Sequence, residues 1–180
     1  SRNLDRAEDA DKYIKEALRY LDGLTDREKY STRGFYYRMI ADNAQCVKEY
    51  GELAARYPAD VVAYNQRAIC LKSLHRVREA TDEMRQAVKI LPNHVVLRTN
   101  LALFESLAGE FEAAEKETRS IPPRLFAYVA LAYSQVGRGL LREAAATYEK
   151  IATLDARGAS IAASGLGDIA VVEGRFSDAA

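Results

Sequence analysis

The sequence predicts an all-α protein, built as a right-handed solenoid of stacked helix-turn-helix repeats. The first observation is a period of 34 residues, which separates Pro58 from Pro92; each proline closes an amphipathic segment rich in Ala, Leu and Tyr. The second is the spacing of apolar residues, which recur three and four positions apart and therefore share one face of a helix. The third is the regular placement of small residues and glycines, which suits closely packed helices and tight turns.

Residues of the same kind coincide when the chain is overlaid on itself at this period: Tyr30 with Tyr64, Gly34 with Ala68, Tyr37 with Leu71, Cys46 with Ala80, and Leu53 with Ala87. We expect a half-repeat over residues 4–22, repeats over about 27–58, 61–92, 95–121 and 123–156, and a truncated repeat over 159–180. One hairpin leaves apolar surface that only its neighbour can cover, so the copies should stack as a single array.

Turn and capping signals locate the helix ends. Thr25 and Glu28 predict a capping box at the start of the first full repeat. Pro122 and Pro123 predict a short second helix in the third repeat, because proline cannot continue a helix interior. In the fourth repeat, Gly137-Arg138-Gly139 is expected to lengthen the turn by two residues. Small residues should lie where paired helices approach closely (Gly34, Ala68, Ala102, Ala130), and glycines where helices end (Gly109, Gly137, Gly174).

These matched positions resemble the tetratricopeptide repeat family over essentially the whole chain. The resemblance implies that the first helices of the repeats line a concave groove and that the second helices form the convex back. Two short stretches, Tyr20–Glu28 and Glu173–Ala180, are similar to the repeat arrays attached to bacterial membrane-anchored serine/threonine kinases. The chain contains neither the HRD nor the DFG motif, so this second resemblance implies no catalysis in it.

The resemblance to the tetratricopeptide family also implies which residues point into the groove. Four apolar residues, nine places into each repeat, are expected to line it: Phe35, Ile69, Leu103 and Leu131, flanked by Met39 and Leu107. Hydrogen-bonding groups and charges are expected beside them: Ser31, Asn65, Thr99, Arg38 and Lys72. Such a lining suits an apolar or amphipathic segment of a partner. The alternative is that these side chains only pack helix against helix.

Some members of this family hold a C-terminal carboxylate of a chaperone with a clamp of Lys and Asn residues. Asn100 and Arg124 fall on two places of that clamp. The first clamp positions hold Ser31 and Phe35, or Asn65 and Ile69, in place of the required Lys and Asn, so the sequence gives this clamp little support.

Composition argues against several classes of protein. Lys plus Arg and Asp plus Glu number 26 each, so the chain lacks the basic surplus with which nucleic-acid binders follow the phosphate backbone. No apolar run approaches the roughly 18 residues that span a bilayer, and no basic start precedes an apolar core. We expect a soluble segment without membrane insertion, either cytoplasmic or on the extracytoplasmic side of a membrane-anchored parent.

No pattern predicts a catalytic site, a metal site or a cofactor. Cys46 and Cys70 form no CxxC pair, and we expect two buried small residues rather than a disulfide or a zinc site. His75 and His94 belong to no HExxH motif or Cys/His cluster. The stretch 165–170 matches GxGxxA, but no strand precedes it, so small residues at a helix crossing are expected instead of a dinucleotide site.

Two pairs of charges recur at the repeat period. Arg33 and Arg67 are 34 residues apart, and Glu49 and Glu83 each follow their arginine by 16 residues. In an antiparallel hairpin this spacing can bring each arginine against its glutamate, because an unpaired charge at a core-facing place is costly. The alternative is two solvated charges on a helix face.

The sequence therefore predicts a protein–protein interaction scaffold that binds a partner segment in its groove, as a non-enzymatic fragment of a larger signalling protein. Two alternatives remain: a small-ligand sensor or accessory domain of an enzyme such as a kinase, which would need an enclosed polar pocket, and a self-assembly module. The chain looks cut from a longer protein, so self-association through the helix at 161–172 is expected as an effect of truncation.

Overall fold

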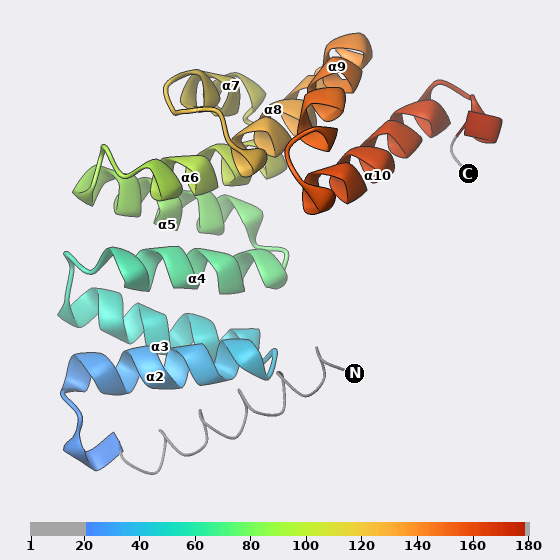
Figure 1. Cartoon of the computed structure of the whole chain (residues 1–180). Coiled ribbons are helices and arrows are strands. Elements are labelled where there is room, and N and C mark those ends of the chain that lie inside the picture. Colours follow the sequence, from blue (N-terminus) through green and yellow to red (C-terminus); the bar gives the residue numbers. More distant parts are fainter. Residues whose placement is uncertain (1–20, 179–180) are drawn as a thin grey trace. The chain divides into compact units, whose positions relative to one another are not determined.

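The computed structural model describes residues 21–178, and within this range it is entirely helical, which confirms the predicted all-α fold. Most of the half-repeat expected over residues 4–22 lies outside the described residues. The α-helices are α2 (Asp26–Met39), α3 (Asn43–Arg56), α4 (Val61–Ser73), α5 (Val77–Ile90), α6 (Val95–Leu107), α7 (Phe111–Arg119), α8 (Leu125–Gly137), α9 (Leu141–Ala152) and α10 (Ala156–Val172) (Figure 1). Single 3-10 turns, η1 (Leu21–Gly23) and η2 (Phe176–Asp178), flank them.

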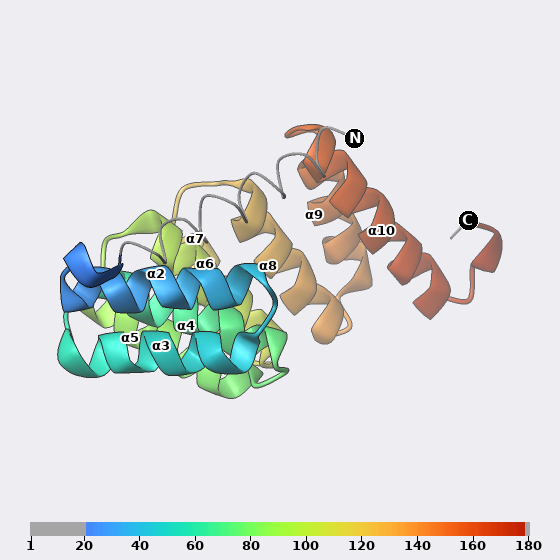
Figure 2. The ribbon, with the colours of Figure 1, turned by 90° about the horizontal axis from the view of Figure 1, so that it is seen from below.

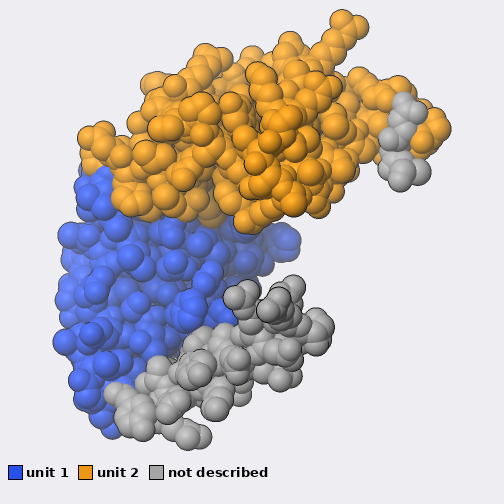
Figure 3. Space-filling model, viewed as in Figure 1, with its two compact units in different colours: residues 1–91 blue, residues 92–180 orange. Residues whose placement is uncertain are grey.

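The chain divides into two compact units, Ser1–Leu91 and Pro92–Ala180, whereas the sequence predicted one continuous array (Figure 3). In the first unit α3 packs on α2, α4 on α3 and α5 on α4, as stacked and roughly parallel rods (Figures 1 and 2). In the second unit α8 contacts α6, α7 and α9, and α10 packs on α9. The boundary between the units falls at Pro92, the proline that closes the second full repeat.

The first unit is organised around a ring packed on a glycine. Tyr50 of α3 is 2% exposed, and its ring lies where a Cβ on Gly34 of α2 would approach to 2.7 Å. A glycine is required here because any side chain would collide with that ring, so the predicted close approach of the paired helices at Gly34 is confirmed. The remaining core residues of this unit include Cys46, Leu53, Ala54, Ala63 and Cys70.

Cys46 of α3 and Cys70 of α4 form a disulfide, so the expectation of two unbonded cysteines was wrong. Both side chains are fully buried, as expected. Because α3 and α4 are neighbours from successive hairpins, their packing brings the two Cα atoms within 6.2 Å, which lies inside the range that a disulfide spans. The separation of 24 residues matches no sequence motif, and only the packing of the two helices reveals the pair.

The second unit repeats the ring-on-glycine packing twice. A Cβ on Gly165 of α10 would lie 2.2 Å from the ring of Tyr148, and one on Gly137 of α8 would lie 2.2 Å from the ring of Phe111. The glycines of the GxGxxA stretch therefore lie inside a helix, and Gly165 serves a helix crossing, as expected. Around these contacts lies the core of the unit: Val129, Ala132, Ala144, Tyr148, Ile151, Ala162 and Ile169.

The first helix of every hairpin ends in the same way. One residue with positive φ lies two places beyond the last helical residue, at Ala41, His75, Gly109, Gly139 and Gly174. After α4, α6, α8 and α10, the next amide also donates to a carbonyl five residues back, as Arg76 does to Leu71 at 3.0 Å, which is the hydrogen bonding of a Schellman motif. The turn after α8 is three residues long, as is the turn after α6, so the expected two-residue lengthening was wrong.

Other local predictions are confirmed. Thr25 and Glu28 form the capping box of α2, with the Thr25 amide donating to the Glu28 carboxylate at 2.9 Å. Helix α7 is the shortest α-helix of the described range, with nine residues, and it ends just before Pro122 and Pro123.

Both recurring charge pairs form, which decides between the two alternatives in favour of pairing. Arg33 Nε lies 2.8 Å from a carboxylate oxygen of Glu49, and Arg67 Nη1 lies 2.9 Å from one of Glu83. Burial is the main cause that raises the pKa of Glu83, and the nearby Arg67 guanidinium opposes it. The pairs link the two helices of a hairpin on partly buried sites, where an arginine can keep its head group near water.

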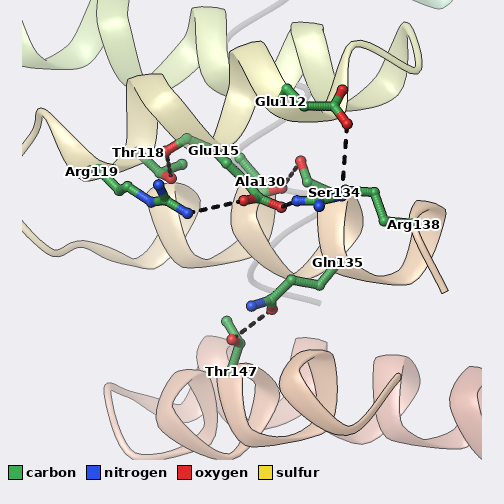
Figure 4. A network of polar contacts seen from close by, with 9 residues as sticks. All are labelled: Glu112, Glu115, Thr118, Arg119, Ala130, Ser134, Gln135, Arg138 and Thr147. Carbon is green, nitrogen blue, oxygen red and sulfur yellow. Dashed lines mark hydrogen bonds and ion pairs between the residues drawn. The ribbon is translucent and has the colours of Figure 1, made fainter. Parts of the chain in front are cut away.

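A polar network joins α7, α8 and α9 in the second unit (Figure 4). Its centre is Glu115 of α7, whose side chain is 10% exposed and accepts from Arg138 at 2.6 Å and Arg119 at 3.2 Å. Across the next interface, the Thr147 hydroxyl donates to the Gln135 side chain at 2.8 Å. Because the carboxylate of Glu115 is paired from two sides, its burial beneath α8 is tolerated.

Candidate partner-binding surface

The positive-φ residue after each first helix marks an equivalent place in the chain, so the first helices can be aligned by counting back from it. The residue six places before each turn residue occupies the same helical position in all five helices. These residues, which we call the ladder positions, are Phe35, Ile69, Leu103, Tyr133 and Asp168. The first two lie in the first unit, and the other three lie in the second unit.

In the first unit the ladder positions carry apolar side chains that remain accessible. Phe35 is 38% exposed, Met39 one turn further on is 45% exposed, and Ile69 is half-buried. The Arg38 guanidinium lies 5.1 Å from the centre of the Phe35 ring, in the range of a cation–π contact. Arg38 Nε is buried and has no hydrogen-bond partner within the described residues, so its charge is held beside the ring with spare donor capacity.

The polar neighbours expected in the first unit differ in accessibility. Lys72 is exposed, while Ser31 and Asn65 are half-buried. The backbone carbonyl of Ser31 accepts a hydrogen bond from the Tyr50 hydroxyl at 3.4 Å, so this carbonyl helps to hold the buried Tyr50 ring. Asn65 is not free either, because it already interacts with another group of the protein.

In the second unit the expected residues differ in accessibility, and Thr99, although nearly buried, lines a pocket of about 270 Å³. Leu103 is half-buried against the core of the unit, and Leu107 is 42% exposed. Thr99 is only 3% exposed, and its hydroxyl donates to the carbonyl of Val95 at 2.7 Å. The hydroxyl hydrogen is therefore already used inside its own helix, and only the acceptor capacity of the oxygen is left for a partner.

Leu131 does not occupy the position expected of it. It lines a small cavity of about 100 Å³ with Ile121, Pro123 and Tyr128, next to the end of α7. Tyr133, which is 39% exposed, stands at the ladder position of α8 instead. The sequence comparison placed this repeat two residues out of register, and the glycine of the following turn, Gly139, was the signal that could have corrected it.

Three larger pockets lie within single units. One of about 490 Å³ surrounds the Arg27–Asp60 ion pair, whose atoms lie 2.7 Å apart, so its polar groups are already matched. Another, of about 270 Å³, contains Asn100 and Arg124, the two residues that fit places of a carboxylate clamp. The third, of about 260 Å³, lies between α8, α9 and α10 and contains Tyr133 and Asp168.

The described part of the chain offers neither a metal site nor a membrane span. No group of three or more His, Cys, Asp or Glu residues between 21 and 178 could hold a metal ion. Among the helices described, none combines the length and the apolar character needed to cross a bilayer.

Comparison with known proteins identifies the fold. No family model matches the sequence, and no curated protein matches it. A thermophilic TPR protein of Thermus thermophilus, TTC0263, is 21% identical and matches 92% of this chain and 93% of its own, with a TM-score of 0.73. MamA (41-end) from Desulfovibrio magneticus RS-1 is 17% identical over 87% of this chain and 90% of its own, with a TM-score of 0.70.

The TPR2B domain of yeast Sti1, solved in complex with pHsp70, is also similar. It is 26% identical and matches 69% of this chain and 94% of its own, with a TM-score of 0.51. Together these likenesses show that the chain has a tetratricopeptide-like fold, an α-solenoid of helical hairpins.

Proposed function

We propose that this chain is a non-enzymatic protein-interaction scaffold in which each unit binds a segment of a partner protein at its own ladder positions. The observation that carries the proposal is the recurrence of accessible large side chains at one helical position, above all Phe35 and Tyr133, at 38% and 39% exposure. Side chains of this size are normally buried, and repeated exposure at one position favours a contact surface over chance. Rigid aromatic side chains are also common anchors of protein interfaces.

Similar structures support this class of function. The Sti1 TPR2B domain was solved with pHsp70, so a domain of this fold can hold another protein or peptide. The pocket that contains Asn100 and Arg124 would suit an acidic group of such a segment, although the other clamp positions carry unsuitable residues. We infer that binding along the ladder is mainly apolar, and nucleic acid is not an expected partner, since the chain has equal numbers of acidic and basic residues.

The alternative of a small-ligand sensor has weaker support. The pocket of about 490 Å³ has a volume typical of drug-sized ligands, but its charged residues Arg27 and Asp60 already bind each other. The similarity of Tyr20–Glu28 and Glu173–Ala180 to kinase-attached repeats supports a signalling context for the scaffold.

Self-association is a second contact that we propose, through the end of α10. Val171, Val172 and Phe176 are 49%, 67% and 70% exposed and lie within six residues of one another. Exposed apolar groups that lie this close together favour contact with another protein surface, here a second copy of the chain. Sedimentation velocity over a range of concentrations tests this: Val172→Asp should weaken any dimer, and a strict monomer at all concentrations would rule it out.

The scaffold function is tested by selecting binders from a displayed library of random peptides and measuring their affinities. We expect Phe35→Ala, or Tyr133→Ala, to weaken the peptides that bind the corresponding unit, by roughly tenfold or more for a buried anchor. Lys48→Ala, at an exposed residue of the second helix α3, is the matched control and should leave affinity unchanged. Unfolding midpoints separate loss of binding from loss of folding. Peptides that bind equally well to every variant would contradict the proposal.

A further inference from the structure

The pocket between α8, α9 and α10 differs from the other ladder sites because an acidic side chain lines it. Its volume is about 260 Å³, and its lining includes Tyr133 of α8, Tyr148 of α9, and Ser160, Ser164 and Asp168 of α10. Tyr133 and Asp168 both occupy ladder positions, so this pocket lies on the surface that we propose for partner binding. At the equivalent position of α2 and α4 stand the apolar residues Phe35 and Ile69.

Asp168 is the only charged residue that lines this pocket. The ion pairs found in residues 92–178 use other carboxylates, those of Glu112, Glu115, Glu117 and Glu173. Helix α8 contains no charged residue, and the one cation of α10, Arg157, lies over the Phe126 ring at 4.8 Å. The cations of α9, Arg142 and Lys150, do not line the pocket. The described part of the chain therefore leaves the charge of Asp168 without a cation opposite it.

The floor of the pocket is shaped to bring the hydroxyl end of Tyr148 beneath α10. A Cβ on Gly165 would lie 2.2 Å from Tyr148 Cζ, so only a glycine leaves room for this end of the ring. Tyr148 is 3% exposed, and burial, followed by the influence of Tyr133 and Asp168, raises its pKa to about 12. Its hydroxyl is therefore neutral at physiological pH and cannot supply a second negative charge.

We propose that this pocket binds one basic side chain, arginine or lysine, of the partner segment, with the cationic group at Asp168 and the rest of the side chain against Tyr133. The proposal rests on the scaffold function proposed above and names the chemistry of one residue of its partner. A carboxylate forms charge-assisted hydrogen bonds with either cation, and an aromatic face attracts the same groups. The pocket is smaller than the roughly 300–1,000 Å³ of small-molecule sites, which suits a single side chain.

The direct test is an NMR titration of the isotope-labelled chain with three blocked amino acids: N-acetyl-arginine methylamide, N-acetyl-lysine methylamide and the neutral norleucine analogue. We expect at least one of the two cations to give saturating shifts confined to the amides around Tyr133 and Ser160–Asp168. Asp168→Asn should weaken that binding roughly tenfold. Glu149→Gln, at an exposed carboxylate of α9, is the matched control and should leave the response unchanged.

Equal responses to norleucine and to the cations would overturn the proposal, as would a response that Asp168→Asn leaves intact. The selected peptides separate this result from the scaffold function. Peptides that lose affinity on Tyr133→Ala, but not on Asp168→Asn, would overturn the basic-residue pocket and leave the scaffold standing. Peptides indifferent to every ladder substitution would overturn the scaffold function itself.

Discussion

Gly165 of α10 lies directly against the ring of Tyr148 of α9, where a Cβ would come within 2.2 Å of Cζ. Alanine normally stabilises a helix relative to glycine by about 0.5–1 kcal/mol, because glycine loses more backbone freedom on folding. At this position the added methyl must displace a buried ring, and the same packing recurs between Gly34 and Tyr50.

Gly165→Ala should therefore lower the free energy of unfolding, by about 1–3 kcal/mol, the usual cost of overpacking a core. Gly51→Ala in α3 is the matched control, because its Cβ would meet only the Arg67 side chain at an ordinary 3.6 Å. The Gly51→Ala variant should be as stable as the unaltered protein or slightly more stable. Urea unfolding of both variants is the measurement, and a Gly165→Ala protein as stable as Gly51→Ala would show that the α9–α10 contact is looser than described.

Reduction of the Cys46–Cys70 disulfide should destabilise the first unit. The bond closes a loop with a sequence separation of 24 residues, and loops of this size confer about 3 kcal/mol by restricting the unfolded chain. A reductant should lower the unfolding midpoint of the protein and have no effect on the double variant Cys46→Ala/Cys70→Ala. Two thiols free to alkylate in the denatured, unreduced protein would contradict the bond.

Glu83→Gln should change stability with a definite dependence on pH. Burial raises the pKa of Glu83 in the folded state, so folding favours its protonated form despite the Arg67 guanidinium. The carboxylate then costs stability above its folded pKa, and this cost disappears as the pH falls below the usual carboxyl pKa. Relative to the unaltered protein, Glu83→Gln should be most favourable at neutral pH and lose that advantage in acid. An advantage that grows in acid would mean that the ion pair outweighs burial.

Two buried tyrosines should make the fold sensitive to alkali. Burial raises the pKa of Tyr50 and of Tyr148 from 10.0 to about 12. The unfolded chain ionises first, so stability should fall between these pH values, by up to about 1.4 kcal/mol per pH unit for each tyrosine. Tyr50→Phe and Tyr148→Phe should each reduce this slope when unfolding is measured at increasing pH. An unchanged slope in both variants would contradict the burial of these hydroxyls.

The sequence predicted the helices well because their apolar spacing, the Thr25–Glu28 capping box and the turn glycines are all local signals. It failed at α8, where the short α7 changes the spacing between repeats, so Leu131 was placed where Tyr133 stands. The small residues and prolines of the repeats do not reveal this two-residue shift in register, whereas aligning the helices on Gly109 and Gly139 reveals it.

Long-range features were harder to predict. The disulfide joins α3 and α4 of successive hairpins, and no spacing rule connects its cysteines. The acidic ladder position was also missed, because Asp168 belongs to a helix of 17 residues, which is longer than the other first helices and hides the register unless it is counted back from Gly174. A sequence also does not show whether a hydroxyl bonds within its own helix, as that of Thr99 does.

Photo-crosslinking of a selected peptide tests the central claim most directly. A benzoylphenylalanine placed singly at Phe35, Ile69, Leu103 or Tyr133 should crosslink to the peptides that bind the corresponding unit. The same group at exposed residues of the second helices, Lys48, Gln86 and Glu149, should not. We expect crosslinks from ladder positions alone. Crosslinks that form from the second helices, with none from the ladder positions, would contradict it.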